Sequence, residues 1–160
     1  GDRIAVLREE RVGDSRREGR IVQVGTPEEI FRRPATPFVA QFVGGKNLFR
    51  GYAVRTGEGT FVEIEGGLQV AVATDREGPV HLLVRPEDIL LSTFPLQSSA
   101  RNCFRGRVVE IRDAGAVFYV TVEVPPRFTV LVTRRSREEM GLRPGMEVCV
   151  TFKASAVHLL

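Results

Sequence analysis

The stretch Phe118-Tyr-Val-Thr-Val-Glu-Val124 places an apolar residue at every second position. Side chains on a β-strand point to opposite faces in turn, so this period predicts a strand with one buried face. The same period recurs at Phe128/Val130/Val132 and at Val148/Val150/Phe152. Between these strands, Ser136-Arg-Glu-Glu139 is a capping box that predicts a helix of one to two turns, ended by Gly141. Short strands around one short helix predict a small barrel of the OB type.

Similar strands are predicted upstream of this region. Val62/Ile64 and Leu68/Val70/Val72 alternate on either side of Gly66-Gly67, which predicts a hairpin. Val80 to Val84 predicts another strand, and residues 93–100 are typical of a linker. We therefore predict a first β subdomain over residues 47–93 and a second over residues 98–160.

Residues 1–46 differ from the rest of the chain in the elements that their sequence predicts. Residues 2–7 and 21–24 predict two strands of a hairpin, and the polar stretch from Arg8 to Arg20 predicts a long loop at its tip, to which we assign no role. Thr26-Pro-Glu-Glu29 and Thr36-Pro37 predict the starts of two short helices, the second ended by Gly44-Gly45. The predicted fold class is α+β, mostly β, with a short helical N-terminal segment before the OB-like units.

Composition narrows the class of protein. The chain has 160 residues, a net charge of +3 and no apolar run of the roughly 20 residues that a membrane helix needs. Cys103 and Cys149 lack the spacing of a zinc site, and His81 and His158 stand alone, so we expect no direct protein ligands to a metal and a reducing compartment. Because the sequence does not open with Met, we expect a fragment of a longer protein or a natural short product.

Catalytic motifs are missing from the sequence. It contains no GxxxxGK[ST] phosphate loop, no GxSxG and no HExxH, and its carboxylates are scattered. We predict that this chain is not an enzyme and has no ATP site.

Two segments combine a cation, a hydroxyl and a small residue, the mixture that a tetrahedral oxyanion requires. Thr133 and Ser136, at the start of the predicted helix, add free backbone donors and a positive dipole end. The alternative is that the serines form turns or caps while Arg101 and Lys153 are simply solvated. The candidate residues in the two segments are Ser99, Ala100, Arg101, Asn102, Lys153, Ala154 and Ser155.

Residues 99–160 resemble the Mop (molybdenum-pterin-binding) fold, also called the TOBE domain, of molybdate and tungstate transport proteins. The resemblance is carried by Ser99-Ala-Arg-Asn102, Phe104-Arg-Gly106, Val132-Thr-Arg-Arg-Ser136, Gly141-Leu-Arg-Pro-Gly145 and Phe152-Lys-Ala-Ser-Ala-Val157. It implies molybdate or tungstate as the ligand, held by Ser99 to Asn102 and Lys153 to Ser155 where two units meet. Thr133 and Ser136 would reach in from the partner unit. Arg134-Arg135 and Pro125-Pro126 depart from the family's usual residues.

The N-terminal part resembles the closing segment of an ABC-transporter ATPase subunit. The match is carried by Asp2 to Leu7, Gly19 to Phe31, Pro34, Phe38 to Gly44 and Asn47. Arg85-Pro-Glu-Asp-Ile89 resembles a turn of the regulatory domains that follow such ATPases. The resemblance implies a cytoplasmic regulatory module at the inner face of the membrane. The implied partners are a second copy of the chain, the ATPase domain and a membrane permease.

Three classes of function follow. The first is a molybdate- or tungstate-binding regulatory module, and the second is a structural dimerisation module of a transporter for another solute, without an anion. The third is a nucleic-acid-binding barrel, which requires aromatic residues interleaved with basic ones on an exposed face. We set it aside because the chain has two Tyr and no Trp, and most of its Phe fall on apolar alternations. The residues do not separate molybdate from tungstate.

Overall fold

The computed structural model describes residues 3–12, 16–25 and 47–160. The chain divides into two compact units, the first within residues 1–45 and the second comprising Lys46–Leu159. No helix in the described ranges is long and apolar enough to cross a membrane.

The described part of the first unit is an antiparallel hairpin of β1 (Ile4–Val12) and β2 (Arg16–Gly25). The predicted loop from Arg8 to Arg20 is therefore largely wrong, since both strands continue through it and pair from Arg8↔Arg20 to Val12↔Arg16. Backbone groups alone form such a ladder, so a polar sequence does not prevent it. The hairpin tip at residues 13–15 and the helices predicted within 26–45 lie outside the described residues.

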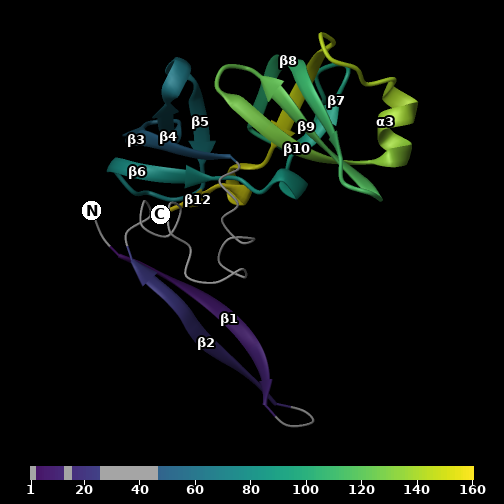
Figure 1. The fold of residues 1–160 in the computed structure, drawn as a ribbon. Coiled ribbons are helices and arrows are strands. Elements are labelled where there is room, and N and C mark those ends of the chain that lie inside the picture. Colours follow the sequence, from purple (N-terminus) through teal and green to yellow (C-terminus); the bar gives the residue numbers. More distant parts are fainter. Residues whose placement is uncertain (1–2, 13–15, 26–46) are drawn as a thin grey trace. The chain divides into compact units, whose positions relative to one another are not determined.

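The second unit consists of two five-stranded antiparallel sheets (Figure 1). The first sheet has the order β12-β6-β3-β4-β5 and the second the order β10-β9-β8-β11-β7. The strand bounds are β3 Leu48–Thr56, β4 Gly59–Ile64, β5 Gln69–Val72, β6 Gly78–Leu83, β7 Leu90–Ser92, β8 Asn102–Asp113, β9 Val117–Glu123, β10 Arg127–Thr133, β11 Glu147–Phe152 and β12 His158–Leu159.

The short helix α3 (Arg134–Met140) begins three residues before its predicted first residue, Arg137. Its N-cap is Thr133, whose hydroxyl accepts a hydrogen bond from the Ser136 backbone N–H at 3.1 Å, so the prediction of Ser136 as the cap is wrong. Thr133 ends β10 in an extended conformation, which is the backbone that an N-cap requires. Gly141 ends the helix as predicted, with a left-handed φ of 62°.

Strand pairing reveals an internal repeat that our sequence interpretation missed. The pentapeptide Asn-x-Phe-Arg-Gly opens β3 at residues 47–51 and β8 at residues 102–106. Both glycines lie where a Cβ would strike the neighbouring strand. The nearest atoms at Gly51 would be Val62 Cγ1 at 2.5 Å and the Glu63 carbonyl oxygen at 2.9 Å; at Gly106 they would be Val122 Cγ1 and the Glu123 carbonyl oxygen, each at 2.7 Å. We call residues 47–92 the first repeat and residues 102–159 the second repeat.

The repeats exchange their last strands. β7 of the first repeat pairs with β11 of the second sheet, and β12 of the second repeat pairs with β6 of the first sheet. Figure 1 shows the C-terminal end of the chain, in yellow, passing from the second sheet to the first, where β12 pairs with β6. Because each sheet holds strands from both repeats, neither sheet is built from one continuous segment. The predicted domain division at residues 47–93 and 98–160 stays a prediction.

One hydrophobic core joins the two sheets. Four phenylalanine rings form a chain through it, with centroid distances of 5.1 Å for Phe49–Phe128, 5.8 Å for Phe128–Phe152 and 5.9 Å for Phe152–Phe104. The residues predicted to alternate on β9, β10 and β11 supply much of this core. The mostly β prediction is confirmed, and the curled second sheet fits the predicted OB-like unit.

Candidate functional site

The pairing of β8 with β11 brings the two predicted anion-binding segments together. Asn102, the first residue of β8, is the register partner of Phe152, the last residue of β11. Arg101 and Lys153 therefore leave the sheet at the same end of neighbouring strands. Lys153, Ser99 and Ser155 are exposed, and Ala100 and Ala154 are half-buried. An exposed pair of cations beside small and hydroxyl residues suits an anion.

Arg101 is oriented by the first sheet. Its Nη2 donates to the Glu58 carbonyl oxygen at 3.1 Å, and its guanidinium carbon lies 5.5 Å from the centre of the Phe61 ring. Gly59, at a φ of 124°, makes room, because a Cβ there would lie 3.3 Å from both terminal nitrogens. A guanidinium has five N–H donors, so these contacts orient the group and leave donors for an anion.

The side chain of Asn102 is buried and bonds to the backbone of Ala71. Its side chain is 1% exposed, and its Oδ1 accepts from Ala71 N at 2.8 Å while its Nδ2 donates to Ala71 O at 2.9 Å. The amide thus behaves like one more peptide group added to the free edge of β5, which satisfies backbone atoms that burial would otherwise leave unpaired. The Asn102 side chain is therefore buried against β5, whereas the neighbouring Arg101 is exposed.

The first repeat contains the same clamp. Asn47 is 4% exposed, accepts from Thr129 N at 2.6 Å and donates to Thr129 O at 2.7 Å on the edge strand β10. Each repeat therefore opens with an asparagine that closes the edge of the other sheet. The shared Asn-x-Phe-Arg-Gly motif was the sequence signal that could have identified both clamps.

Thr133 and Ser136 lie apart from the cationic pair. Thr133 pairs with Val117 at the start of β9, whereas Arg101 and Lys153 flank the opposite end of the long strand β8. The two hydroxyls bond to each other at 2.9 Å. The structure of one chain does not bring them to Arg101, and their contribution from a second copy stays a prediction.

Acidic and thiol groups near these elements have shifted pKa values. The Gly115 backbone N–H, followed by the Arg134 guanidinium, holds the pKa of Asp113 below its usual value. Burial raises the pKa of the Cys149 thiol, and the neighbouring Cys103 adds to that rise. In the portion described, no group of three or more His, Cys, Asp and Glu side chains could hold a metal ion.

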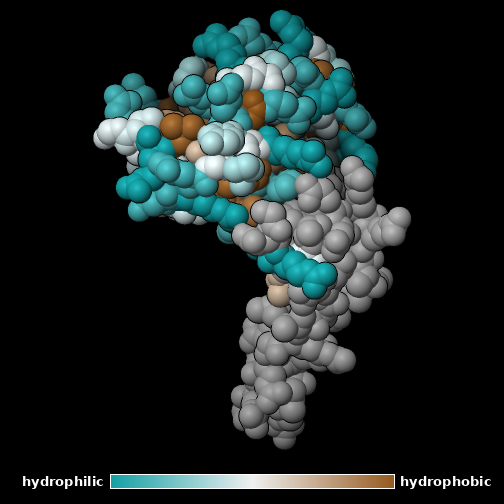
Figure 2. All heavy atoms as spheres, turned by 90° about the vertical axis from the view of Figure 1, so that its left-hand side faces the viewer, coloured by the Kyte–Doolittle hydropathy of each residue, from teal (hydrophilic) through white to brown (hydrophobic). Residues whose placement is uncertain are grey.

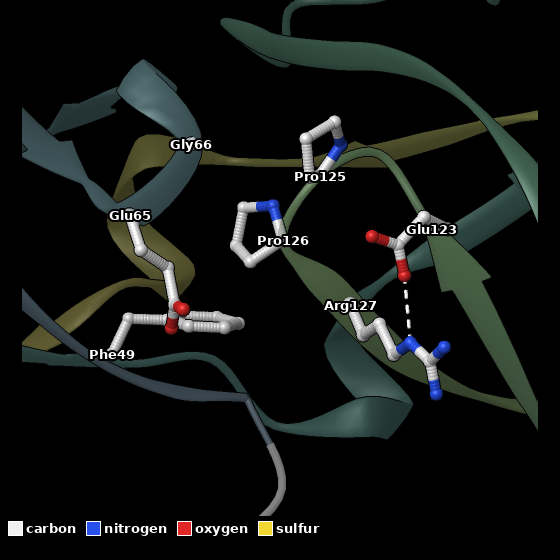
Figure 3. A pocket seen from close by; sticks show the side chains of 7 residues that line it. All are labelled: Phe49, Glu65, Gly66, Glu123, Pro125, Pro126 and Arg127. Atoms are coloured by element: carbon white, nitrogen blue, oxygen red, sulfur yellow. Dashed lines mark hydrogen bonds and ion pairs between the residues drawn. The ribbon is translucent and has the colours of Figure 1, made fainter.

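A groove lies where turns of the two repeats meet (Figure 3). Gly66, with a φ of 79°, approaches Pro125 so closely that a Cβ would lie 3.2 Å from the Pro125 carbonyl oxygen. The prolines that depart from the family's usual residues thus pack against the other repeat. Glu123 and Arg127 form an ion pair at the rim of the groove, with 2.7 Å between Arg127 Nε and Glu123 Oε2. The groove has a volume of about 380 Å³ and is lined by Phe49, Glu65, Gly66, Glu123, Pro125, Pro126 and Arg127, none of which is a predicted site residue.

The outer face of the first sheet exposes apolar side chains. Val54 is 48% exposed and pairs directly with Phe61, the ring beneath Arg101, and Tyr52 is 57% exposed on the same strand. Figure 2, which views the molecule from the side of this sheet, shows hydrophobic residues surrounded by hydrophilic ones. Arg101 therefore borders a partly apolar surface.

The family model of the TOBE domain matches residues 98–159, the segment that contains both cationic segments and the clamp. Residues 98–159 form a TOBE domain. This assignment confirms the resemblance identified in the sequence. It also places the exchanged strand β12 inside the TOBE domain, although β12 completes the first sheet.

Relatives of this chain are named as import ATP-binding proteins. The molybdate/tungstate import ATP-binding protein WtpC of Pyrococcus abyssi is 39% identical over 160 residues, which cover 99% of this chain and 42% of that protein. The spermidine/putrescine import ATP-binding protein PotA of Trichormus variabilis is 41% identical over 122 residues, which cover 71% of this chain and 29% of that protein. The chain thus spans about two fifths of the length of the WtpC protein that it matches.

A solved structure shares the fold of a large part of this chain. The cytoplasmic molybdate-binding protein ModG, in a crystal form with molybdate bound, superposes with a TM-score of 0.64 at 26% identity. The match covers 71% of this chain and 94% of the ModG chain. A molybdate-binding protein can therefore be built almost entirely on this architecture.

Proposed function

We propose that the chain binds molybdate or tungstate and acts as the regulatory module of an importer's ATP-binding subunit. The observation that carries the proposal is the register of β8 and β11, which sets Arg101 and Lys153 at adjacent strand ends beside Ser99 and Ser155. The resemblance to WtpC and the molybdate-bound ModG support the choice of anion.

The wider setting belongs to the same proposal. The chain works on the cytoplasmic side, at the inner face of the membrane, together with an ATPase domain and a permease. It forms a homodimer in which Thr133 and Ser136 of one copy approach the cationic pair of the other. It neither binds nor hydrolyses ATP by itself, because the nucleotide motifs are absent from its sequence.

Substitution of Lys153 tests the proposal directly. Charge-assisted hydrogen bonds contribute about 1.5–3 kcal/mol, so Lys153→Ala should weaken molybdate binding roughly ten- to a hundredfold. Lys153 is exposed at the end of β11, so the fold should persist. Isothermal titration calorimetry with molybdate, tungstate and sulfate measures the effect, with Arg76→Ala as the control that removes an exposed cation elsewhere.

Sulfate provides the specificity control. It is a smaller dianion, so a site spaced for longer metal–oxygen bonds leaves donors unpaired, each at a cost of about 1–3 kcal/mol. Equal affinity for sulfate and molybdate, or unchanged molybdate affinity in Lys153→Ala, contradicts the proposal.

A second function is favoured by one finding. The PotA relatives, at 41% identity, are named for spermidine and putrescine, which are cations, so relatives of this chain include importers of solutes other than oxyanions. In that case the same fold acts as a dimerisation module without a bound anion. Sedimentation of a dimer together with no heat of molybdate binding would favour this alternative.

A further inference from the structure

We infer that only one of the two equivalent 3-10 turns of the chain serves an oxyanion, and that Pro86, Glu87 and Asp88 bar the other from doing so. The inference rests on the proposed function and limits it to one site for each chain. The two turns are η3 (Ala154–Ala156) in the second repeat and η2 (Pro86–Asp88) in the first.

The backbones of the two turns correspond closely. Lys153 precedes η3 with φ −76° and ψ 148°, and Arg85 precedes η2 with φ −71° and ψ 141°. Ala156 N donates to Lys153 O at 3.0 Å, and Asp88 N donates to Arg85 O at the same distance. Both turns lead into the exchanged strands, β12 and β7.

The residues around the turns also correspond. Val157 and Ile89 follow the turns and are both buried in the shared core, at 8% and 2% exposure. η3 contacts β5, the strand clamped by Asn102, and η2 contacts β10, the strand clamped by Asn47. In the sequence, a cation precedes each clamp, Arg101 before Asn102 and Lys46 before Asn47. The two repeats thus share the backbone of the turn, and in the sequence of each repeat one cation precedes the clamp and another precedes the turn.

Three differences in chemistry separate the turns. Ala154 carries a backbone N–H, whereas Pro86 has none and cannot donate. Ser155 offers a hydroxyl donor where Glu87 offers a carboxylate, which only accepts when ionised. Ala156 is uncharged where Asp88 adds a second negative charge, and like charges a few ångströms apart repel. Glu87 and Asp88 are both exposed, so their side chains face the solvent from which an anion would approach. A dianion at η2 would lose donors and meet two carboxylates.

Counting bound anions by native mass spectrometry tests this inference. With saturating molybdate we expect no more than one molybdate for each chain, and Arg85→Ala should leave that number unchanged. The double variant Ser155→Glu/Ala156→Asp places the chemistry of η2 on η3 and should abolish binding, with at least a hundredfold loss of affinity. The neutral variant Ser155→Gln/Ala156→Asn is the matched control for charge, and it should bind molybdate at least tenfold more tightly than the charged double variant. Circular dichroism checks that each variant is folded.

The outcomes separate the inference from the proposed function. Two molybdates for each chain would overturn the inference and leave the proposed function standing. Binding that survives in a folded Ser155→Glu/Ala156→Asp variant, or that disappears in Arg85→Ala, would also overturn it. If the parent chain binds no molybdate at all, the proposed function itself fails. Should the double variant not fold, the number of molybdates on the parent and on Arg85→Ala still decides the question.

Discussion

The two repeats of the second unit share their backbone and their core but differ in the chemistry of their exposed turns. Each opens with Asn-x-Phe-Arg-Gly, each asparagine clamps the edge of the opposite sheet, and each ends in a 3-10 turn and an exchanged strand. In those turns, the first repeat has Glu87 and Asp88 where the second repeat has Ser155 and Ala156. Packing and buried hydrogen bonds constrain the shared features, whereas exposed turns can change with little effect on stability.

The largest expected effect is the loss of stability when an equivalent buried side chain of each repeat is truncated. Phe128 and Val70 are equivalent, since each precedes the residue that the opposite asparagine clamps, and both are fully buried. Phe128→Ala should lower the free energy of unfolding by about 4 kcal/mol, because it removes a ring that contacts both Phe49 and Phe152. Val70→Ala, which removes two methyl groups, should cost about 2 kcal/mol. Urea denaturation measures both losses, and equal losses would contradict the expected dependence on the size of the removed side chain.

The asparagine clamps provide the next comparison. Asn102→Ala and Asn47→Ala each leave one backbone N–H and one carbonyl without their partner, at about 1–3 kcal/mol for each group. Because the two clamps have the same geometry, we expect losses within about 1 kcal/mol of each other, near 3 kcal/mol each.

Hydrogen exchange distinguishes the two clamp variants. Asn102→Ala should expose the amide of Ala71 first, and Asn47→Ala that of Thr129. Unchanged protection at both amides would contradict the clamp interpretation.

Cys103 and Cys149 lie in the second repeat, and the first repeat has no cysteine. The pH dependence of stability therefore provides a further comparison of the two repeats. Burial raises the pKa of Cys149 above its ordinary value of 9.0. A raised pKa favours the protonated thiol in the folded state, so its contribution to stability is complete below about pH 9 and is lost as the pH rises further. The urea midpoint of the parent should therefore fall between pH 8 and pH 10 by more than that of Cys149→Ala. An identical fall in both proteins would show that other groups account for it.

The hairpin turns supply the smallest expected effect. In the first repeat the Thr56 hydroxyl accepts from Glu58 N at 3.1 Å, and in the second the Asp113 carboxylate accepts from Gly115 N at 2.8 Å. This bond, more than the Arg134 guanidinium, lowers the pKa of Asp113 below 3.8, so its contribution to stability is present above that pH and is lost as the pH falls through the lowered pKa.

An NMR titration checks the origin of that shift. Arg134→Ala should return the pKa of Asp113 only part of the way to 3.8, because the Gly115 bond persists. A complete return would show that the ion pair is the main cause.

Local patterns in the sequence predicted most of the strands of the second unit. The alternations at Phe118 to Val124 and at Val148 to Phe152 predicted buried faces because the period of two is a property of the strand itself. The helix was predicted but its cap was misplaced, since both Thr133 and Ser136 are good caps and only the end of β10 decides between them. The Arg8 to Arg20 region was wrong because we equated polarity with a loop.

The candidate site was partly predictable. Motif order placed Ser99 to Asn102 and Lys153 to Ser155 in one site, and the β8–β11 register brings these segments together. The roles of the individual residues in these segments could not be predicted from the order of the motifs. Asn102 and Arg101 look alike in a list of polar residues, but one is buried against Ala71 and the other lies over Phe61.

The sequence by itself determined the mostly β class, the buried faces of the strands and the family of residues 98–159, because each of these is expressed in the order and period of neighbouring residues. Only the tertiary structure decided that the two repeats exchange β7 and β12, that Asn47 and Asn102 close each other's sheets, and that η2 and η3 are equivalent turns. Those features join residues between 31 and 82 positions apart, and hydrogen bonds over such separations leave no local period in the chain.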